Sequence, residues 1–273
     1  MNRNIDFTLQ KFTEILDSLL KSGYSFQSLE DFIKNPSERA VILRHDVDSS
    51  HVNSLQTARL ENARGLKGTY YFRIVKQSNN PRVIKEIAAL GHEIGYHYED
   101  LILAAERQKT KGTRLQDYGR LEKELADIAI ESFGSNLQRI RDIVPVKTIC
   151  MHGSPMSRWD SRILWKYYDY HDFGIIGEPY FDLDFSTVLY LTDTGRKWNG
   201  DKSSVRDKVF QENFMELKEK LKNSGDIIKA ASMNELPKRL MITVHPQRWT
   251  DNLFLWTWEY GTQTLKNYIK RLI

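Results

Sequence analysis

The chain has 273 residues, of which 40% are hydrophobic and 28% charged, a composition typical of a soluble globular protein. This composition excludes disordered, collagen-like and coiled-coil classes of chain. The 40 basic and 36 acidic residues leave a formal net charge of +4, without a long run of Lys or Arg. Nothing in the charge pattern therefore indicates a nucleic acid partner.

The sequence offers no membrane-spanning or secretory segment. No stretch approaches the roughly 18 to 20 uninterrupted apolar residues that cross a bilayer, and residues 1–11 lack an apolar secretory core. We therefore expect a cytoplasmic protein without a membrane span. The lone cysteine, Cys150, excludes an intramolecular disulfide and a Cys-rich zinc module, so a metal site has to use His and carboxylate side chains.

Strand-like and helix-like segments alternate along the chain. Apolar runs typical of strands lie at 40–43, 68–74, 93–97, 146–151, 173–176, 187–192 and 240–244. Helical periodicity predicts helices at 6–21, 50–63, 81–90, 114–133, 204–223 and from beyond Pro246 to the terminus. This alternation predicts a mostly parallel sheet with helices outside it, either doubly wound or closed into a barrel. Since α/β barrels of roughly 200 to 250 residues commonly fold as one unit, we expect one domain.

Four histidines directly follow strand-like runs: His45, His97, His152 and His245. In parallel α/β folds the carboxyl ends of the strands share one edge, where active sites lie. We therefore expect these side chains to converge, although each one alone fits a strand end or a satisfied core imidazole.

Two carboxylates, Asp46 and Asp48, end the first of these runs. Being two residues apart on a strand, they are expected to point the same way. One carboxylate can then bind a cation while its neighbour accepts a proton from a water. The alternative for Asp48 is to cap the helix that follows.

The polar motifs resemble those of the polysaccharide deacetylases of the NodB-homology type. The similar segments are 45–48 (His-Asp-Val-Asp), 91–97 (Gly-His-Glu-Ile-Gly-Tyr-His), 152–155 and 242–245, in the family's order and spacing. The resemblance covers residues 40–246 and implies a distorted (β/α) barrel of about seven parallel strands. It implies one domain over residues 1–273, with the N-terminal helical segment 1–36 packed on the barrel. The chain is most similar to cytoplasmic members associated with making capsule or lipopolysaccharide O-antigen.

The resemblance also implies a role for each matching residue. Asp46 corresponds to the catalytic base, Asp48 and His97 to metal ligands, and His245 to the general acid. The expected cofactor is a divalent transition metal, zinc first, since carboxylate and imidazole suit it. The family's third motif carries an Arg that pairs with the base, and this Arg is missing here. Arg44, two residues before Asp46, is expected to supply that charge, unless it pairs with an unrelated acid.

The third metal ligand departs from the family pattern. A second histidine usually follows the first by four residues, but Leu101 stands there and cannot bind a metal. The replacement we expect is His152, followed by Asp100 and then Glu99. A site without metal is the remaining alternative.

A further loop is a candidate for substrate binding. Asp193 and Trp198 follow a strand-like run, and Trp249 comes soon after His245. A carboxylate can hydrogen-bond sugar hydroxyls, and an indole ring can stack on a pyranose face. The alternatives are a turn stabilised by Asp193 and packing of Trp249 against the last helix.

The expected function is metal-dependent hydrolysis of an acetyl group on a sugar or oligosaccharide in surface polysaccharide biosynthesis. One alternative is an amidase for a cyclic imide or ureide on the same scaffold, with or without metal. Another is a non-catalytic carbohydrate-binding barrel. The sugar, the choice between N-acetyl and O-acetyl, and the oligomeric state stay open.

Overall fold

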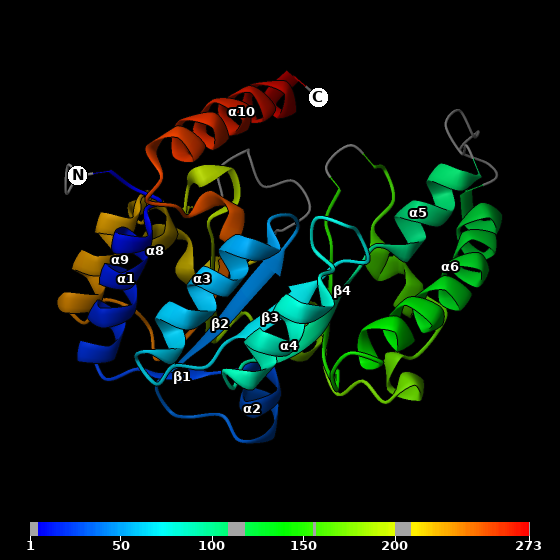
Figure 1. Cartoon of the computed structure of the whole chain (residues 1–273), viewed down its shortest axis with the longest axis horizontal. Coiled ribbons are helices and arrows are strands. Elements are labelled where there is room, and N and C mark those ends of the chain that lie inside the picture. Colours follow the sequence, from blue (N-terminus) through cyan, green and yellow to red (C-terminus); the bar gives the residue numbers. More distant parts are fainter. Residues whose placement is uncertain (1–4, 109–117, 155–156, 200–208, 273) are drawn as a thin grey trace.

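The computed structural model describes residues 5–108, 118–154, 157–199 and 209–272 (Figure 1). Its strands form one sheet in the order β5–β4–β3–β2–β7–β6, and β1 pairs with the first half of β2. Every strand pair in the described ranges is parallel. The strands are β1 (Ser25–Gln27), β2 (Ala40–Val47), β3 (Thr69–Phe72), β4 (Glu93–Tyr98), β5 (Ile149–Met151), β6 (Val188–Thr192) and β7 (Arg239–Val244).

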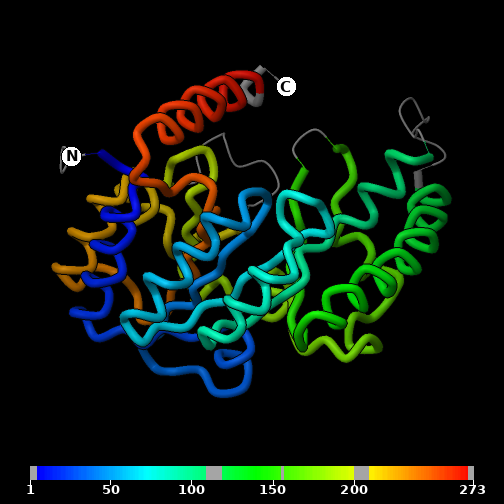
Figure 2. Tube along the Cα trace, viewed as in Figure 1, coloured from blue at the N-terminus to red at the C-terminus, as the bar shows by residue number. Residues whose placement is uncertain are grey.

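Helices surround the sheet. At one end of the molecule α1 packs against α9, and at the other end α5 packs against α6 (Figure 2). The helices are α1 (Leu9–Lys21), α2 (Leu29–Lys34), α3 (His51–Asn62), α4 (Pro81–Ala89), α5 (Asp100–Arg107), α6 (Tyr118–Arg141), α7 (Pro179–Asp182), α8 (Met215–Lys220), α9 (Ser224–Ser232) and α10 (Leu253–Leu272). Short 3₁₀ helices are η2 (Ser161–Lys166), η3 (Tyr170–Phe173), η4 (Thr194–Arg196), η5 (Glu212–Phe214) and η6 (Pro246–Arg248).

The sheet curls into a half-barrel. Its two outer strands are β5 and β6, which do not pair with each other within the described part of the chain. The structure confirms the predicted distorted (β/α) barrel of about seven parallel strands with helices outside.

The central strand β2 fixes which side chains enter the barrel. All eight of its residues are buried, as expected for a strand with parallel neighbours on both sides. Ala40 and Ile42 pack in the apolar cluster inside the half-barrel, whereas Val41 packs toward the outer helices α1 and α9. Because side chains alternate along a strand, the inner face continues at Arg44 and Asp46.

Residues at the two ends of α4 determine where this helix begins and where the chain turns into β4. Oδ1 of Asn80 accepts hydrogen bonds from the backbone N–H groups of Arg82 and Val83, at 3.1 and 3.2 Å, and Pro81 occupies the first turn. Gly91, at φ +90°, turns the chain after the helix into β4. The strand then carries His97 to the barrel mouth.

Two strand assignments need correction. The expected strand at 173–176 is the end of η3 followed by a left-handed turn at Gly174 (φ +67°), and only Gly177 forms an isolated bridge, with Thr148. A left-handed residue cannot continue a strand, which explains the break. The missed strand, β1, is three residues long, too short for a period-two pattern to stand out.

Two expected helices also differ. The segment 114–133 is helical from Tyr118, where α6 begins, and α6 continues to Arg141; residues 114–117 lie outside the described ranges. The segment 204–223 contains η5 and α8 instead of one helix, and residues 204–208 lie outside the described ranges. The backbone leaves the helical region at Leu221 (ψ 76°) before α9 starts under its own cap at Asn223.

Candidate active site

The inner face of β2 ends in a buried ion pair. Arg44 donates from Nε to Oδ1 of Asp46 at 2.8 Å and from Nη2 to Oδ2 at 2.7 Å. Arg44 also donates from Nη1 to the Tyr180 hydroxyl at 3.2 Å. Burial alone would lower the pKa of Arg44, but the Asp46 carboxylate outweighs it and raises that pKa well above its ordinary value. The two parallel hydrogen bonds fix the plane of the Asp46 carboxylate.

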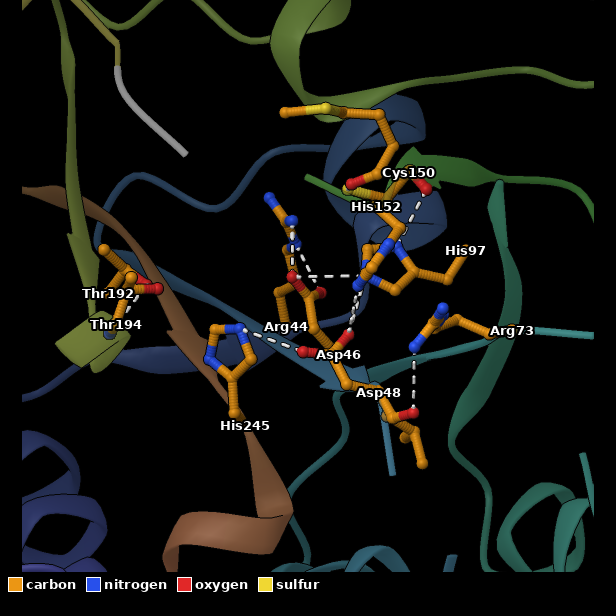
Figure 3. A network of polar contacts seen from close by, with 12 residues as sticks. Arg44, Asp46, Asp48, Arg73, His97, Cys150, His152, Thr192, Thr194 and His245 are labelled. Carbon is orange, nitrogen blue, oxygen red and sulfur yellow. Dashed lines mark hydrogen bonds and ion pairs between the residues drawn. The ribbon is translucent and has the colours of Figure 1, made fainter. Parts of the chain in front are cut away.

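Three imidazoles converge on Asp48, one residue beyond β2 (Figure 3). Oδ1 of Asp48 lies 3.4 Å from Nε2 of His97 and 3.4 Å from Nε2 of His152, and Oδ2 lies 3.7 Å from Nε2 of His245. Burial raises the pKa of Asp48, but the imidazoles, His152 first among them, lower it well below its ordinary value. The Asp48 side chain keeps 24% of its exposure, so this cluster opens to solvent.

The orientation of His97 is set by its second ring nitrogen. Nδ1 of His97 donates to the backbone carbonyl of Cys150 at 2.9 Å, across the β4–β5 pairing. In the neutral ring Nε2 is then the unprotonated atom, and it faces Asp48 at 3.4 Å and Oδ2 of Asp46 at 3.7 Å. A lone pair facing two carboxylates is favourable when a cation lies between them.

The second ring nitrogen of His152, Nδ1, is also held by a neighbouring group. Its Nδ1 lies 3.0 Å from Oε2 of Glu99. Glu99 in turn accepts two hydrogen bonds from Arg73, Nε to Oε1 at 2.9 Å and Nη2 to Oε2 at 2.7 Å. Burial would raise the pKa of Glu99, but His152 and Arg73 lower it. Sequence reasoning missed Arg73, which lies just beyond β3 and also donates to the Asp48 carbonyl at 3.3 Å.

This donor set fits a divalent transition metal. Oδ1 of Asp48 is buried and has no hydrogen-bond partner among the described residues, and it faces two imidazole nitrogens. One carboxylate with two imidazoles is a common ligand set of catalytic zinc, with further positions left for water and substrate. The residues that would hold the metal are therefore Asp48, His97 and His152.

A second donor set overlaps the first. Asp46, His97 and the buried Cys150 offer ligand atoms that all lie within 4.8 Å of one another, so this group could also hold a metal. Both oxygens of Asp46 already accept hydrogen bonds from Arg44, which favours the set built on Asp48. A thiol donor was not expected, because only His and carboxylate side chains were expected from the sequence as metal ligands.

The other candidates for the third ligand point elsewhere. Asp100 faces the core under α6, where its carboxylate accepts hydrogen bonds at 2.6 to 2.9 Å from Tyr96, Ser132 and Asn136. Glu99 faces the far nitrogen of His152. Of the three candidates, His152 is therefore the side chain that reaches Asp48.

His245 is held by Asp193 after β6, and this corrects the expected role of Asp193. Oδ1 of Asp193 lies 2.5 Å from Nδ1 of His245, and Oδ2 accepts from the His245 backbone N–H at 2.9 Å. Burial would raise the pKa of Asp193, but Arg248 and His245 lower it to about 2. Burial and Arg248 lower the pKa of His245, and Asp193 together with Asp48 more than offsets them, so the net shift is upward. Asp193 is fully buried and occupied by these partners, so it is not free to bind a sugar.

Trp198 and Trp249 also need correction as stacking platforms. They keep 1% and 0% of their exposure, so neither ring has a face open to a ligand. Trp249 donates from Nε1 to Oδ2 of Asp193 at 2.8 Å, and Trp198 donates from Nε1 to Ser224 at 3.0 Å. Both rings pack around Phe7, which the sequence did not indicate as their partner.

His45 does not join the site. It lies on the opposite face of β2, where Nε2 is 2.8 Å from Oε1 of Glu61 and the ring stacks on Tyr70 at 4.0 Å between centroids. Its position one residue from Asp46 on an alternating strand explains this orientation. Three of the four strand-end histidines therefore meet.

Comparisons with known proteins give distant structural similarity. No family model and no curated protein matches the chain. The chain is similar to a crystal structure of a CE4 family pseudoenzyme from Bacillus anthracis, at 13% identity and a TM-score of 0.39, over 86% of this chain and 63% of that one. A mutant of that pseudoenzyme with restored enzymatic activity gives 13% identity and a TM-score of 0.39, over 86% and 65%.

A third similar structure is the Xyl-CE4 domain of a multidomain xylanase from the hindgut metagenome of Trinervitermes trinervoides. It gives 12% identity and a TM-score of 0.35, over 86% of this chain and 85% of that one. The chain spans just under two thirds of the length of the first two structures. At this distance the likeness supports no functional assignment, which rests on the side chains of the site.

In the described ranges, no helix is both long enough and apolar enough to cross a bilayer.

Proposed function

We propose that this protein is a metal-dependent hydrolase of the NodB-homology type that removes an acetyl group from an acetylated sugar. One observation carries the proposal: Oδ1 of Asp48 lies 3.4 Å from Nε2 of both His97 and His152, beside a second carboxylate and a third imidazole. A ligand set, a base and an acid thus share one opening at the barrel mouth.

In this proposal Asp48, His97 and His152 hold the cation. When bound, a divalent cation at this place would polarise the acetyl carbonyl and make a neighbouring water more acidic. Glu99 and Cys150 act on the ligands, since they fix the second ring nitrogens of His152 and His97.

Asp46 is the base. It borders the cluster through His97, at 3.7 Å, and Arg44 holds its carboxylate in one orientation. Asp46 accepts a proton from the water whose oxygen attacks the acetyl carbon. Arg44 is a positioning residue in this step.

His245 is the acid. Its Nε2 faces Asp48, and Asp193 holds Nδ1 and raises the pKa of the ring, which favours the protonated form. The bond between the acetyl carbon and the sugar nitrogen or oxygen breaks, His245 gives its proton to that leaving atom, and acetate is released.

The substrate we propose is a sugar or oligosaccharide intermediate of surface polysaccharide synthesis in the cytoplasm. The support for this narrower statement is the similarity of the chain, within the NodB-homology type, to cytoplasmic members associated with making capsule or lipopolysaccharide O-antigen. We further propose that residues 1–273 act as one domain, because α1 packs on α9 and shares an apolar cluster with β2, β6 and β7.

Acetate release from zinc-loaded protein tests the proposal. A panel of N-acetylated amino sugars, their nucleotide-linked forms and O-acetylated oligosaccharides is incubated with the full chain before and after chelation. We expect zinc-dependent acetate release that Asp46→Asn abolishes while metal content is kept, and that Asp48→Ala abolishes together with metal content. Equal metal content in the two variants would contradict the assigned roles.

Two further assays, with cyclic imides and ureides as substrates and with glycans as ligands, separate the alternatives. Hydrolysis of a cyclic imide or ureide by metal-free protein would favour the amidase. Glycan binding by fully loaded protein without any acetate release would favour a binding barrel.

A further inference from the structure

Helix α10 carries a row of exposed apolar side chains. Phe254, Trp258, Leu265 and Tyr268 keep 75%, 68%, 61% and 64% of their exposure. With Gly261 they follow a spacing of four, three, four and three residues, which places them on one side of the helix. We call residues 254, 258, 261, 265 and 268 the α10 stripe.

The opposite side of α10 is bound to the body of the protein. Nε1 of Trp256 donates to the Asp6 carbonyl at 2.8 Å, and Nδ2 of Asn267 donates to the Gly195 carbonyl at 2.9 Å. Gln263, between them, is buried. The helix therefore has a fixed rotation with its stripe outward, along the edge of the molecule (Figure 1).

We propose that the α10 stripe is a dimer interface that pairs with the same stripe of a second copy, with the two helices antiparallel. The stripe is nearly symmetric about Gly261: Phe254 and Tyr268 each lie seven residues from it, and Trp258 and Leu265 lie three and four residues from it. A twofold axis there sets Phe254 opposite Tyr268 of the other copy and brings Trp258 within one residue of the position opposite Leu265, so each large side chain meets an apolar one. An isologous contact requires this self-complementarity.

Gly261 supports close approach at that axis. Glycine is a poor residue for a helix interior compared with alanine. A Cβ at position 261 would meet no heavy atom within 4 Å, so nothing in the described chain requires a glycine there. The backbone of a second helix crossing at this point does require it.

The neighbouring positions favour a second copy over a lipid surface. A helix that lies on a membrane carries Lys and Arg beside its apolar face. Along α10 the charged residues are Glu259, which pairs with Arg196, and three cations, of which Lys270 and Arg271 lie beyond the stripe at the end of the helix and Lys266 lies beside it. The stripe is flanked by uncharged side chains: Leu255, Thr257, Thr262, Thr264 and Ile269.

The exposed surface of the α10 stripe is also large enough for a dimer interface. An aromatic side chain buries roughly 150 to 250 Å². Three partly exposed rings and a leucine on each copy give ~1,000 Å² for the pair, about the lower limit for a specific interface.

Sedimentation of the full chain at about 1 to 100 µM, the range for interfaces of modest size, tests this proposal. We expect a concentration-dependent dimer, whose dissociation constant rises at least about 30-fold in Trp258→Asp, as for loss of a central aromatic. Lys266→Asp, on the same helix but off the stripe, should leave it unchanged. Thermal unfolding checks that both variants fold.

Cross-linking tests the position of the axis. Under mild oxidation, the double variant Phe254→Cys with Tyr268→Cys should give a disulfide-linked dimer, because the axis sets these two positions opposite each other, and Lys266→Cys should not. A monomer at every concentration, a dimer unaffected by Trp258→Asp, or cross-linking only at position 266 would overturn the proposal. So would a monomer that binds anionic vesicles through Trp258. Acetate release plays no part in these readouts, so the result is independent of the proposed function.

Discussion

Nε2 of His152 lies 3.4 Å from Oδ1 of Asp48, although β5 and β2, the strands that carry them, are separated in the sheet by β4 and β3. The curl of the half-barrel brings the two strand ends together across its mouth. Leu101, which stands at the family's usual ligand position, is buried. We propose that His152, at another strand end, takes the place of the histidine that the similar family has at the position of Leu101 in α5.

Replacing His152 should remove metal binding. In His152→Ala the donor set falls to one carboxylate and one imidazole, and we expect zinc affinity to fall at least about 100-fold, more than for loss of an outer partner. Calorimetric titration of chelated protein with zinc measures this. The matched control is His171→Ala, whose side chain is 56% exposed and lies outside the site. Unchanged zinc affinity in His152→Ala would exclude it as a ligand.

Glu99 should act on the metal through His152. Its carboxylate faces Nδ1 at 3.0 Å, and Glu99→Gln keeps the size while it removes the charge. We expect zinc affinity to fall by about 10- to 100-fold, the usual cost of losing a carboxylate behind a ligating histidine. The same titration measures it, with the exposed Glu106→Gln as control. If Glu99→Gln abolishes zinc binding as fully as His152→Ala, Glu99 is itself a ligand.

Asp193 should set the pH range of catalysis. It raises the pKa of His245, so Asp193→Asn lowers that pKa and leaves less of the acid protonated at neutral pH. We expect kcat/KM to fall about 100-fold or more and its basic limb to move to lower pH. A pH profile of acetate release checks both. A basic limb in the same place would show that His245 is not the acid.

Glu178 should make stability depend on pH. Burial raises its pKa to about 7 from 4.5, despite hydrogen bonds from the Tyr180 and Met151 N–H groups. The folded state thus binds this proton more tightly than the unfolded state, so the free energy of unfolding falls as pH rises from 4.5 to 7. At about 1.4 kcal/mol per pKa unit, this fall is roughly 3 kcal/mol.

Denaturant titrations across that pH range measure the effect. Glu178→Gln should lack this decline, although it is less stable at low pH, and the exposed Glu219→Gln should retain it. An identical pH dependence in wild type and Glu178→Gln would show that Glu178 is ionised throughout.

The sequence predicts which strand ends carry the residues of the site. It does not predict which side chains surround and hold those residues. Strand-end positions of Asp48, His97, His152 and His245 follow from apolar runs, and parallel strands bring such ends together. Alternation on β2 also predicted the pairing partner of Asp46. These features follow from apolar runs and from the alternation of side chains along a strand, both of which can be recognised in a single sequence.

The corrected residues depend on contacts between distant segments. Trp198 and Trp249 are buried because Phe7, near the start of the chain, packs against both rings. Asp193 is occupied because β6 and β7 are neighbours, so that it meets His245. These contacts join segments that are far apart in the sequence, so no local pattern predicts them. For this reason a loop that contains Asp193 and Trp198 was interpreted as a sugar-binding site.

A cation held at the ends of β2, β4 and β5 is central to the proposed function. An anomalous difference map from zinc-loaded crystals, collected at the zinc absorption edge, tests this most directly. We predict a single strong peak within bonding distance of Asp48, His97 and His152. A peak bound by Asp46, His97 and Cys150, or no peak at this mouth in crystals of zinc-saturated protein, would contradict it.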